Sequence, residues 1–240
     1  MAKHNYIKHG TLILVRHGES RLNELNIFTG WIDIPLNKKG LDEAHRVADH
    51  CRQFDYDAAF TSHLERAHET LLIILSHQKK IGVFQHEGNL GYNHFKKAPA
   101  EFVSETFPIF TSKNLNERFY GDLQGLDKNV ASRTFGTAKV LKWRRGFKDQ
   151  PPKGESLQDV YNRVVPYFEK YVHPRIKRGE IILVVAHGNT LRAIIKFLEH
   201  INNDQIPFVD IPTGHPLVYS CVKDQFTRVE GEYRFNRPLR

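Results

Sequence analysis

Four polar segments of the sequence contain the side chains that could do chemistry. Each contains a histidine, an arginine or a glutamate of interest: Arg16 and His17 in LVRHGES, Arg66 in TSHLERAHET, Glu117 in LNERFYGDLQG, and His187 in AHGNTLR. Arginine binds anions, histidine can be a nucleophile or a base, and a carboxylate can exchange a proton with a hydroxyl. Taken singly, such residues are more often packed or solvated side chains. Their coincidence in one chain predicts a catalytic site.

Most of these side chains follow apolar stretches of strand length. Arg16 and His17 come after Thr11–Val15, Arg66 after Ala58–Thr61, and His187 after Glu180–Ala186. The carboxyl ends of parallel strands meet at one edge of a sheet, where ligands bind, so we expect these side chains to converge. Gly188 and Asn189 then open a helix, whose first N–H groups can bind an anion.

Two rival kinds of site are disfavoured by the sequence. Metal binding is suggested by fourteen histidines, but there is no His-Glu-x-x-His pattern and no cysteine pair at zinc-finger spacing. Several arginines in one site would also repel a divalent cation. The P-loop pattern of ATP-dependent kinases is absent. We therefore expect no metal and no nucleotide-dependent kinase.

The charge and composition favour a small anionic partner. The formal net charge is +8, and the basic residues are spread along the chain rather than gathered in blocks, which favours a phosphorylated metabolite over nucleic acid. No apolar run is long enough to span a membrane, and the N-terminus lacks the features of a secretory signal. Cys51 and Cys221 fall in apolar-patterned segments, so we expect reduced core residues in a cytoplasmic protein.

Strands and helices alternate along the chain, which predicts an α/β fold with a mostly parallel central sheet and helices on both faces. We expect one domain over residues 1–240, in which the stretch around 82–113 is an insertion or a mobile cover. The predicted helices span 38–51 (capped by Asn37, with Leu41, Ala44, Val47, Ala48 and Cys51 on its apolar face), 63–77, two halves of 127–147 broken near Gly136, 156–172 capped by Ser156, and 188–200. Late strands are expected at 217–222 and 232–235.

Longer strings in the sequence closely resemble the cofactor-dependent phosphoglycerate mutases of the histidine phosphatase superfamily. The resemblance covers Thr11 to Tyr219 and rests on LVRHGESRLNELNIFTGWIDIPLNKKG, LNERFYGDLQGLDK, KWRRGF and IPTGHPLVY. It implies an isomerase of glycolysis and gluconeogenesis that interconverts 3-phosphoglycerate and 2-phosphoglycerate. It further implies a phosphohistidine intermediate and 2,3-bisphosphoglycerate as the primer. A homodimer is a possible assembly of such a protein.

The resemblance also implies a role for each site residue. His17 would accept the phosphoryl group, and Glu117 would be the general acid and base. The transferring group would be surrounded by Arg16, Arg66, His187, Gly188 and Asn189. A ligand-contacting loop would contain Ser20, Asn23, Thr29 and Gly30. The carboxylate or the second phosphate of the substrate would be held by Tyr120, Lys128, Arg144 and Arg145.

The sequence departs from that family pattern in three segments. The stretch between Thr70 and Leu115 is longer than in typical mutases, Asp149–Glu155 is shorter, and the tail EYRFNRPLR is short. Loops of this kind help to exclude water, and a leakier cavity would hydrolyse phosphohistidine. The alternative is therefore a phosphatase or a bisphosphoglycerate-processing enzyme on the same fold. A non-catalytic scaffold would be expected to have lost one of His17, Arg66, Glu117 and His187, and the chain has all four.

Overall fold

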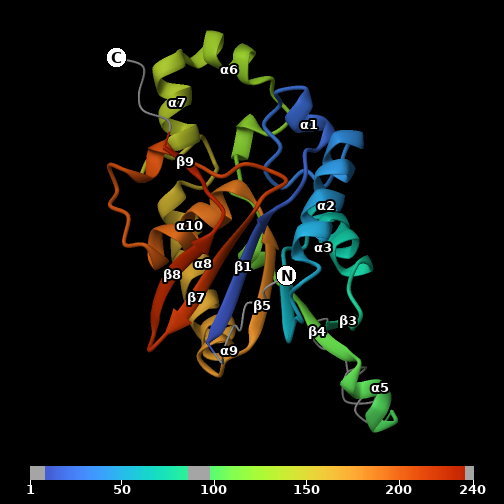
Figure 1. Ribbon diagram of the computed structural model, residues 1–240. Helices are drawn as coiled ribbons and strands as arrows, with labels where there is room; N and C mark the ends of the chain where they lie inside the picture. Colours follow the sequence, from blue (N-terminus) through green and yellow to red (C-terminus); the bar gives the residue numbers. More distant parts are fainter. Residues whose placement is uncertain (1–8, 86–97, 236–240) are drawn as a thin grey trace.

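The computed structural model describes residues 9–85 and 98–235, and its main feature is a seven-stranded sheet in the order β3-β4-β2-β5-β1-β7-β8 (Figure 1). The strands are β1 (Gly10–Arg16), β2 (Ala58–Thr61), β3 (Ile81–Gln85), β4 (Thr106–Thr111), β5 (Ile181–Ala186), β7 (Pro216–Val222) and β8 (Gln225–Glu230). The five strands from β3 to β1 are parallel, and β7 and β8 are antiparallel. The predicted mostly parallel sheet is confirmed.

Helices cover both faces of this sheet (Figure 1). They are α1 (Arg21–Glu24), α2 (Lys38–Cys51), α3 (Glu65–Ser76), α5 (Ala100–Ser104), α6 (Lys128–Phe135), α7 (Thr137–Arg145), α8 (Leu157–Tyr167), α9 (His173–Lys177) and α10 (Gly188–Leu198). Side chains alternate along a strand, so Leu12 and Leu14 of β1 pack with α8 and α10, while Ile13 and Val15 pack with α2 and α3. This two-sided burial explains why β1 and β5 are continuous apolar runs. None of the described helices has the length and apolar character needed to cross a membrane.

Two predicted helix starts are confirmed by their caps. The Asn37 side chain accepts a hydrogen bond from the N–H of Gly40 at the start of α2, and Ser156 forms a capping box with Asp159 at the start of α8. The predicted apolar face of α2 is wrong at Leu41, which is 39% exposed. Glu43 is buried there instead, because its carboxylate accepts the N–H of Glu19. A polar residue thus lies on the buried face.

The two halves of 127–147 are α6 and α7, with Gly136 between them at φ 88°. The predicted helix over 156–172 continues through a π-helical turn at Phe168–Val172 into α9. Two strand predictions at the end of the chain were incomplete. The sequence did not predict β8, and the strand expected at 232–235 is only β9 (Arg234–Phe235), which pairs with β6 (Val209–Asp210).

The segment 82–113 does not cover the site in its described part. It contains most of β3 and all of β4, which extend the parallel sheet beyond β2. The short helix α5 lies at the end of the sheet opposite the carboxyl ends of the parallel strands (Figure 1). Gly82 in the edge strand β3 and Pro108 in its neighbour β4 interrupt the apolar pattern, which is why the sequence showed no period there. Residues 86–97, also part of the expected insertion, lie outside the described residues.

Candidate active site

The two motif histidines follow neighbouring parallel strands. β1 and β5 pair so that Arg16 lies beside Ala186, and the backbone N–H of His17 donates to the carbonyl of Ala186 at 2.9 Å. The ring centroids of His17 and His187 are 4.9 Å apart, and both side chains are buried. The expected convergence at the carboxyl edge of the sheet therefore occurs.

The hydrogen bonds of His17 leave one ring nitrogen available as a nucleophile. Nδ1 lies 2.7 Å from the carbonyl oxygen of Gly18, which can only accept, so Nδ1 carries the proton. Nε2 is then unprotonated, and its electron pair accepts a hydrogen bond from Nε of Arg66 at 3.3 Å. Burial, followed by the charges of Arg66 and Arg16, holds the pKa of His17 well below its ordinary value of 6.5. The imidazole is therefore neutral at physiological pH.

Glycine is required beside this histidine for steric reasons. A Cβ built on Gly18 would lie 2.3 Å from the carbonyl oxygen of Gly40 at the start of α2. The backbone N–H of Gly18 also donates to Oγ1 of Thr70 on α3, at 3.1 Å. The turn after β1 is thus fixed against both helices, and this fixes the position of the His17 ring.

The guanidinium groups beside His17 are held by backbone carbonyls. Arg66 donates to the carbonyls of Ile32 (3.0 Å) and Gly30 (2.8 Å), and Arg16 donates to that of Ile211 (2.7 Å). Burial lowers the pKa of Arg66 to about 10, which still leaves it charged at neutral pH. Their positive charge remains available to an anion.

Glu117 lines the same cavity as these cations, next to the start of α10. Its Oε1 accepts the backbone N–H of Asn189 (3.2 Å), the side-chain amide of Asn189 (2.8 Å) and the N–H of Arg118 (2.7 Å). Its backbone carbonyl accepts from the indole of Trp31 and from Arg163. Both the backbone and one carboxylate oxygen are therefore fixed, as a general acid or base requires.

The outer part of the cavity is formed by α6 and α7. Burial, followed by the charge of Arg144, lowers the pKa of Lys128 to about 8, and burial also lowers the pKa of Arg144. Arg145 is partly neutralised by an ion pair with Asp210 at 3.1 Å. The hydroxyl of Tyr120 accepts from Arg118 (3.0 Å). This wall can bind a second anionic group of a ligand.

One cavity is lined by all of the predicted site residues except two. Ser20 is buried and caps α1, where its hydroxyl hydrogen-bonds the side chain of Asn23 (3.0 Å), and Asn23 does line the cavity. His187 is completely buried, with its ring centroid 4.9 Å from that of His17. Neither residue is part of the cavity lining. The catalytic and binding roles assigned to the whole set stay predictions.

The sequence reasoning missed other residues that line the same cavity: Ile27, Phe28, Arg192, Asp210 and Ile211. Arg192 donates to Oδ1 of Asn189 (3.0 Å) and to the carbonyls of Arg145 (2.9 Å) and Ile206 (2.7 Å). It stands in the AHGNTLR string, so its place one turn after Asn189 on α10 was a usable signal. Phe28 and Ile211 gave no such signal, because apolar residues are common everywhere.

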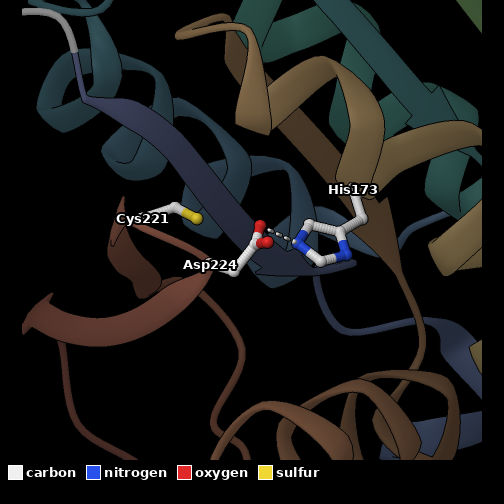
Figure 2. A group of neighbouring side chains, drawn as sticks. All are labelled: His173, Cys221 and Asp224. Carbon is white, nitrogen blue, oxygen red and sulfur yellow. Dashed lines mark ion pairs between the residues drawn. The ribbon is translucent and has the colours of Figure 1, made fainter.

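A group with metal-binding side chains lies at the other end of the sheet. His173 of α9, Cys221 of β7 and Asp224 of the β7–β8 turn have ligand atoms within 4.8 Å of one another (Figure 2). The carboxylate of Asp224 already pairs with His173 (3.4 Å) and with Lys177 (2.6 Å). A cation would have to compete with the ammonium group of Lys177. The observed ion pairs of Asp224 instead connect the β7–β8 hairpin to α9.

Comparisons with known proteins agree with this geometry. The model of the "Histidine phosphatase superfamily (branch 1)" matches residues 12–88 and 97–230. Two relatives are named 2,3-bisphosphoglycerate-dependent phosphoglycerate mutase. That of Methanococcus vannielii is 42% identical, over 87% of this chain and 89% of the relative, and that of Chlamydia abortus is 40% identical, over 90% and 96%.

Solved structures share the fold at lower identity. Bacillus stearothermophilus YhfR has a TM-score of 0.71 at 23% identity, covering 91% of this chain and 95% of its own. A mycobacterial glucosyl-3-phosphoglycerate phosphatase in complex with VO3 has a TM-score of 0.73 at 19% identity, covering 93% and 99%. The match of the family model and the relatives at 40% identity or more show the family. The chain belongs to branch 1 of the histidine phosphatase superfamily, within the family of the 2,3-bisphosphoglycerate-dependent phosphoglycerate mutases.

Proposed function

We propose that the chain interconverts 3-phosphoglycerate and 2-phosphoglycerate, with 2,3-bisphosphoglycerate as primer and His17 as the phosphoryl carrier. The observation that carries the proposal is the unprotonated Nε2 of His17, facing Nε of Arg66 at 3.3 Å in a cavity lined by cationic side chains. An imidazole nucleophile needs that free electron pair, and phosphoryl transfer needs fixed positive charge. The sequence relationship to the named mutases supports the same substrate.

The transfer steps follow from these positions. In the priming step the N–P bond to His17 forms, the P–O bond of 2,3-bisphosphoglycerate breaks, and the departing oxygen takes a proton from Glu117. A 3-phosphoglycerate then accepts the group on its 2-hydroxyl, whose proton goes to Glu117, and bound 2,3-bisphosphoglycerate results. When its 3-phosphoryl group returns to His17, 2-phosphoglycerate is left. Each step conserves one phosphoryl group and one proton.

The cationic walls suit a substrate with two anionic ends. While Arg16, Arg66 and the backbone N–H of Gly188 would hold the transferring phosphoryl group, the N–H of Asn189 holds Glu117. Lys128 and Arg144 would hold the carboxylate or the second phosphate. Because arginines supply the positive charge, we propose that the reaction needs no metal, and addition of EDTA should leave the rate unchanged. We also propose a cytoplasmic location.

One experiment separates mutase from phosphatase. Purified protein is incubated with 3-phosphoglycerate, with and without 2,3-bisphosphoglycerate, and phosphorus NMR follows 2-phosphoglycerate and inorganic phosphate. A mutase gives primer-dependent 2-phosphoglycerate in excess of phosphate. Release of phosphate alone would identify the phosphatase that the short 149–155 loop suggests. His17→Ala is the control, and it should abolish both turnover and acid-labile phosphate on the protein. Turnover by His17→Ala would overturn the proposal.

A further inference from the structure

Ser62 connects the end of β2 to His187, which follows β5. Its side chain is completely buried, and its hydroxyl oxygen lies 2.7 Å from Nε2 of His187. The same oxygen accepts the backbone N–H of Leu64 at 3.1 Å. On the other side of the imidazole, Nδ1 is buried and has no hydrogen-bond partner within the described part of the chain.

The proton count of the serine hydroxyl decides the tautomer of His187. A hydroxyl has one proton to donate and two electron pairs, of which Leu64 occupies one. If Nε2 carried the imidazole proton, Ser62 would accept twice, and its own proton would be left without an acceptor among the described residues. If Ser62 instead donates to Nε2, every group at this contact is satisfied. The imidazole proton is then on Nδ1.

The imidazole of His187 has only one proton to place. Burial, followed by the positive charge of Arg66, holds its pKa well below the ordinary 6.5, so the ring is neutral. His17 is neutral for the same reasons, and its proton is also on Nδ1, where it bonds the carbonyl of Gly18. The two neighbouring rings are therefore in the same tautomer but offer different atoms. His17 offers an electron pair on Nε2, whereas His187 offers an N–H donor.

We propose that Ser62 is a positioning residue that fixes the Nδ1–H tautomer of His187, so that this N–H donates to an oxygen of the phosphoryl group on His17. This inference rests on the proposed function for the identity of the anion. The opposite tautomer would present an electron pair beside the phosphoryl oxygens and repel them. Ser62 thus contributes to catalysis without touching the substrate, because it determines which ring nitrogen of His187 carries the proton.

Nitrogen NMR of protein labelled with ¹⁵N-histidine reads the tautomer directly and needs no turnover. In the wild type we expect the His187 proton on Nδ1, and a proton on Nε2 would overturn the inference. In Ser62→Ala the proton should move wholly or partly to Nε2, while Ser62→Thr, which keeps the hydroxyl, should retain it on Nδ1. Ser112→Ala is the matched control, because Ser112 is also buried, follows a strand and accepts the N–H two residues later. Its removal should leave the tautomer of His187 unchanged.

Kinetics test the consequence for transfer. In Ser62→Ala, phosphorylation of His17 by 2,3-bisphosphoglycerate should slow about 100-fold, the loss typical for one transition-state donor. KM should change much less, and Ser62→Thr should recover most of the rate. An unchanged rate in Ser62→Ala, or a tautomer unaffected by loss of the hydroxyl, would refute the inference. Failure of the wild type to become phosphorylated would instead refute the proposed function and leave the tautomer result standing.

Discussion

Arg163 of α8 braces the segment that carries Glu117. Its guanidinium forms a two-pronged ion pair with Glu155, at 2.8 and 2.9 Å. The same group donates to the backbone carbonyls of Asn114 (2.7 Å), Asn116 (3.0 Å) and Glu117 (2.9 Å). One planar guanidinium group therefore fixes the backbone carbonyl of Glu117, the proposed general acid, and two carbonyls that precede it in the chain. We predict that Arg163→Lys lowers both the stability of the protein and its kcat.

The magnitude follows from what a lysine cannot reproduce. A single ammonium keeps the charge but cannot bond Glu155 twice and also reach three carbonyls. Hydrogen bonds to charged groups contribute about 1.5–3 kcal/mol each, but this pair keeps some solvent contact, with side chains 16% and 21% exposed. Allowing for that screening, we expect a loss of about 3 kcal/mol. In a chain of this size that lowers Tm by about 6–12 °C.

The effect on activity comes through the position of Glu117. A displacement of about 1 Å in a catalytic group can cost about 100-fold in rate, so we expect kcat to fall about 10- to 100-fold at temperatures where the variant is folded. KM should change little, because Arg163 does not line the cavity. The measurements are the primer-dependent mutase assay and thermal unfolding.

Arg178→Lys is the matched control for this variant. Arg178 also makes two hydrogen bonds to a carboxylate, that of Glu180, but its side chain is 59% exposed and far from the site in sequence and fold. Its replacement should change neither Tm nor kcat measurably. If Arg163→Lys behaves like Arg178→Lys in both measurements, the bracing role assigned to Arg163 is refuted.

Further predictions concern the charged groups of the site. Glu117→Gln should lower kcat at least about 100-fold while substrate binding, measured by calorimetry, is retained; a wild-type rate would remove Glu117 from the mechanism. The pKa of Lys128 is lowered to about 8, so kcat/KM of the wild type should decrease as pH rises through 8, and Lys128→Met should have a lower kcat/KM without that decrease. The pKa of His17 is held below 6.5 in the folded state, so the unfolded chain binds more protons below pH 6.5. Stability should therefore decrease as pH falls below 6.5, by up to about 1.4 kcal/mol per pH unit for each such histidine. The free energy of unfolding, measured with urea at several pH values, should depend less steeply on pH in His17→Gln than in the wild type. An equally steep dependence on pH in both proteins would contradict the reasoning.

The sequence predicted those elements whose burial is unambiguous. β1 and β5 lie in the centre of the sheet, so their apolar runs are uninterrupted, and α2 and α8 begin at side chains that cap their first N–H groups. β8 was missed because it is an edge strand whose side chains are only half-buried or exposed. At such an edge the pattern that distinguishes a strand from a loop is weak.

The candidate site was predictable where the topology alone brings residues together. Strand ends that meet at one edge account for Arg16, His17, Arg66 and His187. The role of Ser62 could not be predicted, because it depends on a hydrogen bond between residues 125 positions apart. The contacts of Arg163 with the segment before Glu117 likewise span 46 to 49 positions. Such contacts follow from the folded geometry and leave no local pattern.

The buried arginines explain why this cavity requires an anion. Nitrogen atoms of Arg16, Arg118 and Arg192 are buried without a hydrogen-bond partner in the described part of the chain. Burying a charged donor without a partner costs free energy, and burial lowers the pKa of Arg192 to about 9. Backbone carbonyls satisfy only some of the donors of these three arginines. Glu117 and Asp210 compensate only part of the positive charge that lines the cavity, which comes from Arg16, Arg66, Lys128, Arg144, Arg145 and Arg192. Phosphate oxygens therefore gain the interaction with these cations when they enter, and most strongly when transfer spreads negative charge over them.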